Sequence, residues 1–212
     1  SGGNLRRTLS DNPKGFNWLT ENSSDVSDIQ SYVHNGFTVR DAEQPDVHNP
    51  GLAYRVTVNQ DYTEYTLFFR KGVYWHVPKH PQLQETSFAW LREPREFTAH
   101  DAAFTFEMIR NPQVEAGAIK SYYQDLERVE VIDDYTLKVI WKKKTYQSLN
   151  STLDMFPLPR WLYTKDKLGN ALPKETLGVK FNSHWASAYP IGTGPYQFVS
   201  FEKGTAILLE RN

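Results

Sequence analysis

The residues whose types could do chemistry are spread along this chain and do not form one motif. His76 and His80 have the four-residue spacing of two metal ligands on a helix, but Pro78 between them argues against such a helix. Asp133 and Asp134 are adjacent carboxylates, and the turn expected around them explains them without catalysis. Because no other ligand set is clustered, we predict no metal site, no cofactor and no catalytic residue.

Composition excludes further classes of function. The sequence has no cysteine, no Gly-x-Ser-x-Gly elbow and no glycine-rich loop ending in Gly-Lys-Ser/Thr, so nucleophilic and nucleotide-binding motifs are missing. A net charge of -1 gives no electrostatic basis for binding nucleic acid. Aromatic residues make up 14% of the chain, which suits both a core and the lining of a binding cleft. These observations therefore favour neither an enzyme nor a nucleic-acid partner.

The elements that would position a site follow from hydrophobic periodicity. Alternating apolar residues and turn formers predict hairpins whose strand pairs are 52–58 with 62–70, 129–132 with 135–141, and 196–201 with 205–209. Residues 4–9 are expected to form a first strand. The region 157–190 shows no strong period, and we expect it to be irregular.

Three helices are predicted from apolar spacing and capping residues. Residues 25–33 form the first, with Ser24 or Asp25 as its cap and Gly36 ending it. Thr98 and Asp101 resemble a capping box for a helix that runs to about Arg110. Its expected buried stripe is Phe104, Met108 and Ile109. A short helix over 146–155 would bury Leu149 and Leu153.

The segment Gly192-Thr193-Gly194-Pro195-Tyr196 is a tight backbone feature of a kind that glycines allow easily. It closely resembles the "GTGPY" signature of the family 5 extracellular solute-binding proteins, the peptide- and nickel-binding receptors of ABC importers. Further blocks that resemble the family occur in the same order, at 10–19, 50–76 and 97–106. Four blocks in order indicate kinship, although they describe the scaffold better than the ligand.

The resemblance implies an α/β fold of the periplasmic-binding-protein-like type II. By position, 1–41 and 145–212 correspond to a discontinuous first lobe, and 42–144 to an inserted, smaller mixed β/α subdomain. The family's second lobe would follow residue 212, so the chain looks like one part of a receptor. Residues 77–96 depart from the family pattern as a long insertion, which is either a surface loop or a lid or partner-contact element.

The resemblance also implies the function. We expect the substrate-binding component of an ABC importer, a monomer that binds an oligopeptide or dipeptide between two lobes and delivers it to the permease. Its location would be periplasmic or extracellular, either free or anchored as a lipoprotein. A receptor for an oligosaccharide or a metal chelate, and a sensor or docking module that does not take part in transport, stay open as alternatives.

Candidate ligand contacts lie on the first lobe's side of the cleft, mainly in the loop after the first strand. They are Trp18, Asn22, Ser23, Ser24 and Thr193. Each also has a purely structural interpretation, because Trp18 could fill the core, the loop residues could cap a helix, and Thr193 could serve the turn.

Overall fold

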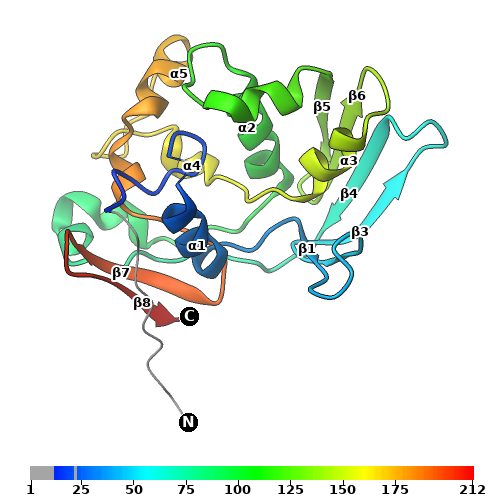
Figure 1. The fold of residues 1–212 in the computed structure, drawn as a ribbon. Coiled ribbons are helices and arrows are strands. Elements are labelled where there is room, and N and C mark those ends of the chain that lie inside the picture. Colours follow the sequence, from blue (N-terminus) through cyan, green and yellow to red (C-terminus); the bar gives the residue numbers. More distant parts are fainter. Residues whose placement is uncertain (1–11, 22) are drawn as a thin grey trace.

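A computed structural model of the chain describes residues 12–21 and 23–212, in which short helices alternate with antiparallel strand pairs (Figure 1). The helices are α1 (Ser24–Val33), η1 (Pro81–Gln84), η2 (Thr86–Arg92), α2 (Ala99–Arg110), η3 (Gly117–Tyr123), α3 (Tyr146–Leu153), α4 (Arg160–Tyr163), α5 (Lys174–Asn182) and η4 (Trp185–Ala188). The strands are β1 (Thr38–Arg40), β2 (His48–Pro50), β3 (Ala53–Val58), β4 (Glu64–Phe69), β5 (Leu126–Asp133), β6 (Thr136–Trp141), β7 (Tyr196–Glu202) and β8 (Ala206–Arg211). The strand expected at 4–9 lies outside the described residues.

The two central hairpins combine into one antiparallel sheet with the order β3-β4-β6-β5. Tyr65, Leu67 and Phe69 are buried on β4, as their alternation predicts. The pairing of β4 with β6 joins the hairpins, and α2 packs against β5 and β6. Strands β3 to β6 and helix α2 are called the sheet unit below.

Helix α2 has the predicted bounds and buries the predicted stripe of Phe104, Met108 and Ile109. At its start, Thr98 N donates to the Asp101 carboxylate (3.0 Å). The same carboxylate accepts a hydrogen bond from Arg160 N at 2.9 Å, so it also ties the helix to α4.

At the other side of Figure 1, β7 and β8 form a separate two-stranded sheet around Lys203-Gly204, where the hairpin was predicted. Helix α1 packs against β7. Phe16, Ile29, Val33 and Phe198 form the small core between them. Helix α1, residues 192–195 and strands β7 and β8 are called the α1 unit below.

Several sequence predictions about the helices were wrong. The N-cap of α1 is Ser23, not Ser24 or Asp25, and the helix ends at Val33 with His34 as its C-cap, so Gly36 does not end it. Leu149 on α3 is exposed, because that helix buries Ser148, Ser151, Thr152 and Leu153 instead.

The region 157–190 is ordered and contains α4, α5 and η4. Its helices are short and irregularly spaced, with buried residues such as Leu162, Leu177 and Phe181 that belong to the main core. Helix α5 places Gly178 against the Asn111 side chain, so part of the packing depends on a missing side chain that periodicity does not register.

The 77–96 segment is folded onto the rest of the protein. Leu83 and Leu91 are each only 1% exposed. Trp90 packs at 6.1 Å between the rings of Trp161 and Trp185, and the ring of Trp90 lies against Gly169. The segment therefore forms part of the core.

Candidate functional site

The loop before α1 is organised by Asn17. Its side-chain oxygen accepts from Leu19 N (3.1 Å), and its carbonyl accepts from Thr20 N (3.1 Å) and Glu21 N (2.8 Å). Asn17 itself is only 1% exposed, so this turn is anchored in the interior. Residues 17–21 therefore form a defined turn.

The predicted loop residues differ in their accessibility. Ser23 is the N-cap of α1, and its Oγ accepts from Val26 N at 3.4 Å, as serine caps do. Ser24 is the first residue of α1 and is exposed. Asn22 lies outside the described residues. Of the described pair, Ser24 is the one that presents an accessible side chain.

Trp18 is half-buried and packs against the main core. Its indole Nε1 is buried and has no hydrogen-bond partner in the protein. The indole also lines a small cavity with His34, Tyr189 and Ile191.

Thr193 is 6% exposed, in a turn that is pressed against the end of α1. Gly194 N donates to Val33 O (2.8 Å), and Asn35 Nδ2 donates to Thr193 O (2.8 Å). A Cβ on Gly192 would lie 2.0 Å from Val33 O, which explains why glycine is needed there. The glycines thus allow the backbone of residues 192–194 to lie close to the end of α1, and this close packing buries Thr193.

His76, which we did not predict to contact this turn, is bonded to it twice. Its backbone N donates to Gly192 O and its Nε2 donates to Gly194 O, both at 2.8 Å. Burial lowers the pKa of His76, and burial together with the nearby His76 lowers the pKa of His34 to about 3. Both imidazoles are therefore neutral at pH 7. Nothing in the sequence spacing links position 76 to 194.

The predicted residues do not form one cluster. Ser23 and Ser24 lie at the start of α1, whereas Thr193 lies beside its end. A helix of 10 residues separates those positions by about 15 Å. Trp18 lies nearer the far end, because it lines the cavity with His34. A ligand at Ser24 would therefore not reach Thr193 unless it were extended.

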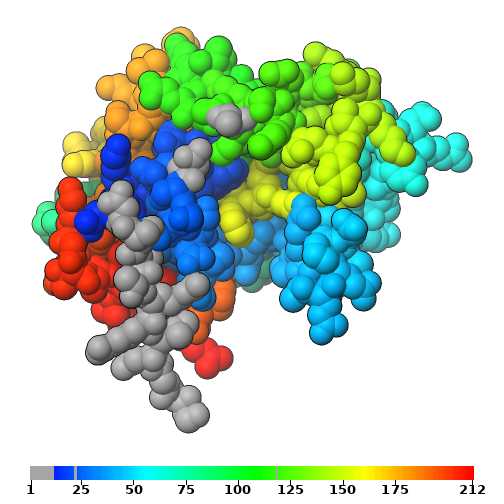
Figure 2. Space-filling view, viewed as in Figure 1, coloured from blue at the N-terminus to red at the C-terminus, as the bar shows by residue number. Residues whose placement is uncertain are grey.

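The surface beside α1 is hollowed in one place. Figure 2 shows residues near 155 (yellow) set back between α1 (blue) and the 38–50 ribbon formed by β1 and β2 (light blue). Phe37 N donates to Met155 O at 2.9 Å, which joins the chain after α1 to this floor.

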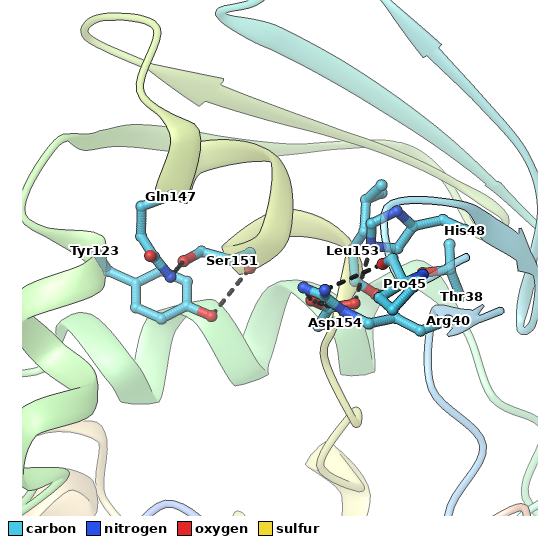
Figure 3. Close-up of polar contacts among 9 residues, drawn as sticks. All are labelled: Thr38, Arg40, Pro45, His48, Tyr123, Gln147, Ser151, Leu153 and Asp154. Atoms are coloured by element: carbon cyan, nitrogen blue, oxygen red, sulfur yellow. Dashed lines mark hydrogen bonds and ion pairs between the residues drawn. The ribbon is translucent and has the colours of Figure 1, made fainter. Parts of the chain in front are cut away.

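The ribbon is tied to α3 by a polar cluster (Figure 3). Arg40 Nε donates to Asp154 Oδ2 (2.9 Å), His48 Nε2 lies 3.0 Å from Asp154 Oδ1, and Thr38 Oγ1 donates to Leu153 O (3.1 Å). The polar groups of this cluster therefore have their hydrogen-bond partners within the cluster. Because surface ion pairs contribute only about 0–1 kcal/mol, the cluster orients the ribbon more than it stabilises it.

The residues considered for metal binding and catalysis have structural partners. Among residues 12–21 and 23–212, no group of three or more His, Asp or Glu side chains could hold a metal ion. His80 stacks on Phe198 with ring centroids 5.9 Å apart, whereas His76 Nε2 bonds to Gly194 O. Asp133 accepts from Tyr135 N at 2.8 Å, which is the turn chemistry predicted for the hairpin.

The helices in the described part of the chain lack the length and apolar character needed to cross a membrane.

Comparison with known proteins gives a consistent family match. The family model described as "Bacterial extracellular solute-binding proteins, family 5 Middle" matches residues 48–212. The dipeptide-binding protein of Escherichia coli (strain K12) is 27% identical over 169 residues, which cover 74% of this chain and 28% of that protein.

Solved structures agree on the fold. The oligopeptide-binding protein AppA from Bacillus subtilis, in complex with a nonapeptide, has a TM-score of 0.72 at 24% identity. That match covers 95% of this chain and 35% of AppA. NikZ from Campylobacter jejuni, in complex with Ni(L-His), has a TM-score of 0.68 at 24% identity and covers 98% of this chain and 34% of NikZ. The chain thus spans about a third of the length of these relatives, and its mixed α/β fold corresponds to part of theirs.

Proposed function

The chain belongs to the family 5 bacterial extracellular solute-binding proteins, and we propose that it is part of the substrate-binding component of an ABC importer whose ligand is an oligopeptide or a dipeptide. The family consists of non-enzymatic binding proteins of ABC transporters. The family match over 48–212 is the observation on which the importer role rests.

The peptide preference rests on the relatives and on the loop before α1. The E. coli relative is a dipeptide-binding protein, and AppA was solved with a nonapeptide. In residues 20–24 the only ionisable side chain is Glu21, and the others are small and polar. Such a wall suits a ligand that is recognised through its backbone and has varied side chains. The candidate contacts are Trp18, Asn22, Ser23, Ser24 and Thr193, of which the exposed Ser24 is the most accessible described residue.

The mechanism we propose is ligand-stabilised closure of two lobes, with the permease recognising the closed state. Residues 1–41 and 145–212 would form the first lobe, and 42–144 the inserted subdomain. The protein would act as a monomer in the periplasm or outside the cell, free or lipid-anchored, without a cofactor or nucleic-acid partner.

Three alternatives differ from this proposal in ligand or in role. NikZ was solved with a nickel chelate, so a metal chelate is the second candidate ligand, and an oligosaccharide is a further one. The third alternative is a sensor or docking module that does not take part in transport and would use the 77–96 segment to contact a partner protein. That segment buries Leu83 and Leu91, which weighs against the docking alternative.

Mass spectrometry of the ligand released on denaturing the gently purified full-length protein tests the proposal. We expect a set of short peptides. A single sugar or metal chelate would keep the importer role and overturn the peptide assignment. A cleft that is empty after growth in several media would contradict the transport role and favour sensing or docking.

A further inference from the structure

A small cavity lies under the loop before α1. Its lining includes Trp18, His34, Leu158 and Tyr189. The space in it that is open to a water molecule is about 10 Å³, close to the lower limit for holding one water. The cavity therefore has room for a single small occupant.

Two of the residues that line this cavity each have a buried polar atom without a partner in the protein. The indole Nε1 of Trp18 and the imidazole Nδ1 of His34 are both buried and make no hydrogen bond. The indole N–H can only donate, and an unprotonated imidazole nitrogen can only accept. Buried polar groups are rarely left unsatisfied, because they have lost their hydration and gained nothing in exchange.

His34 is in the state that can accept. It is 6% exposed, and burial together with the nearby His76 lowers its pKa to about 3. The ring is therefore neutral at pH 7, with one nitrogen unprotonated. In the tautomer that carries its proton on Nε2, Nδ1 needs a donor and the indole N–H needs an acceptor, and no described protein group supplies either.

We propose that this cavity binds one water molecule, which accepts a hydrogen bond from Trp18 Nε1 and donates one to His34 Nδ1. The water links the loop before α1 to the residue that follows the helix. The indole N–H of Trp18 is then occupied by the water and is not available to hydrogen-bond a ligand. This assignment does not depend on which ligand the protein binds.

A second cavity carries the same argument independently. It is lined by His76, His80 and Gln197 among others and also has about 10 Å³ open to a water molecule. Because His76 Nε2 donates to Gly194 O, the Nδ1 of the neutral ring is an acceptor. That atom and Gln197 Oε1 are both buried without partners. A second water that donates to both would satisfy them.

A high-resolution crystal structure of the full chain, combined with water–protein NMR in solution, tests both sites. We expect one density peak in each cavity, within about 2.7–3.2 Å of both named atoms. In solution, the Trp18 indole proton should show a cross-peak to a long-lived water. Trp185 is the matched control, because its Nε1 already donates to Lys165 O at 3.1 Å and needs no buried water.

Two variants test whether the water cross-peak belongs to the Trp18 indole proton. Trp18→Phe should remove the indole cross-peak, whereas Trp185→Phe should leave it in place. An empty cavity with no cross-peak would overturn the assignment, and so would a direct hydrogen bond from Trp18 Nε1 to His34 Nδ1. Neither outcome depends on the variants folding, since both are measured on the unaltered chain.

Discussion

The sheet unit and the α1 unit reach their buried cores by different routes. In the sheet unit each hairpin joins strands that are neighbours in sequence, and apolar alternation decides which face is buried. In the α1 unit the partners come from opposite ends of the described chain. Gly194 N donates to Val33 O, and the rings of Phe16 and Phe198 lie 5.3 Å apart. The α1 unit therefore depends on close backbone approach, which tolerates less change than apolar packing does.

The largest expected effect tests that dependence. Gly192→Ala should lower the free energy of unfolding by about 3 kcal/mol or more, because its Cβ would lie 2.0 Å from Val33 O. Gly204→Ala is the control in the same unit, since its φ is +76° and no atom lies within 4 Å of a Cβ there. We expect about 1 kcal/mol for this control. Urea unfolding followed by circular dichroism measures both, and equal losses would contradict the close-approach argument.

The next effect concerns the 77–96 segment, which belongs to neither the sheet unit nor the α1 unit. Leu91→Ala should lower the free energy of unfolding by about 2–4 kcal/mol, because the side chain is 1% exposed. Leu168→Ala is the control, since Leu168 is 67% exposed and its loss should stay within about 0.5 kcal/mol. If Leu91→Ala behaved like its control, the segment would be a detachable loop and not part of the core.

Acid should weaken the α1 unit through His34. Its pKa is about 3 in the folded state and near 6.5 unfolded, so only the unfolded chain takes up a proton as the pH falls below 6.5. The free energy of unfolding should therefore fall by about 2 kcal/mol from this group between pH 6.5 and pH 5. His34→Leu should remove that share, whereas His100→Asn, at an exposed site of the sheet unit, should not. Denaturant titrations at the two pH values make the comparison.

The sheet unit contains a group, Asp101, whose titration affects stability in the opposite direction. Burial raises the pKa of Asp101 to about 6, so protonation below that value favours the folded state. Asp101 therefore opposes His34 over the same pH range, and amide hydrogen exchange at pH 5 should open the α1 unit before the sheet unit. If the sheet unit opened before the α1 unit, the proposal that acid acts mainly on the α1 unit through His34 would be wrong.

The smallest effect separates two neighbouring serines. Ser23→Ala should cost about 1 kcal/mol, because Ser23 Oγ accepts from Val26 N at the start of α1. Ser24→Ala should change the free energy of unfolding by less than about 0.5 kcal/mol, since Ser24 is exposed inside the first turn. Thermal unfolding resolves the difference. Indistinguishable variants would mean that the cap contributes nothing measurable.

Local patterns were enough to predict the two hairpins and the helix of the sheet unit, but not the pairing of β4 with β6 that joins the hairpins. Tyr65, Leu67 and Phe69 alternate with other residues, and Asp101 stands three residues after Thr98. The signals for the strand and for the helix start therefore each lie within a few residues of sequence. The glycines of 192–194 were likewise recognised as a tight feature, and the family followed from the same short blocks. These predictions held because their physical causes act over a few residues.

The remaining features depend on contacts between distant parts of the chain. The bonds from His76 to residues 192 and 194, the burial of Leu91, and the exposure of Leu149 on α3 follow from which surfaces meet. Helices α4 and α5 were missed because their buried residues have no regular period, and in α5 a glycine, Gly178, lies against the Asn111 side chain.

The sequence alone therefore determined the family, the hairpins and the main helix, because periodicity, capping and turn chemistry are local. Tertiary structure decided which predicted site residues are accessible. It enclosed Thr193 against the end of α1, used Ser23 as a cap and left Ser24 exposed. Accessibility depends on what a distant segment covers, and no local pattern records that.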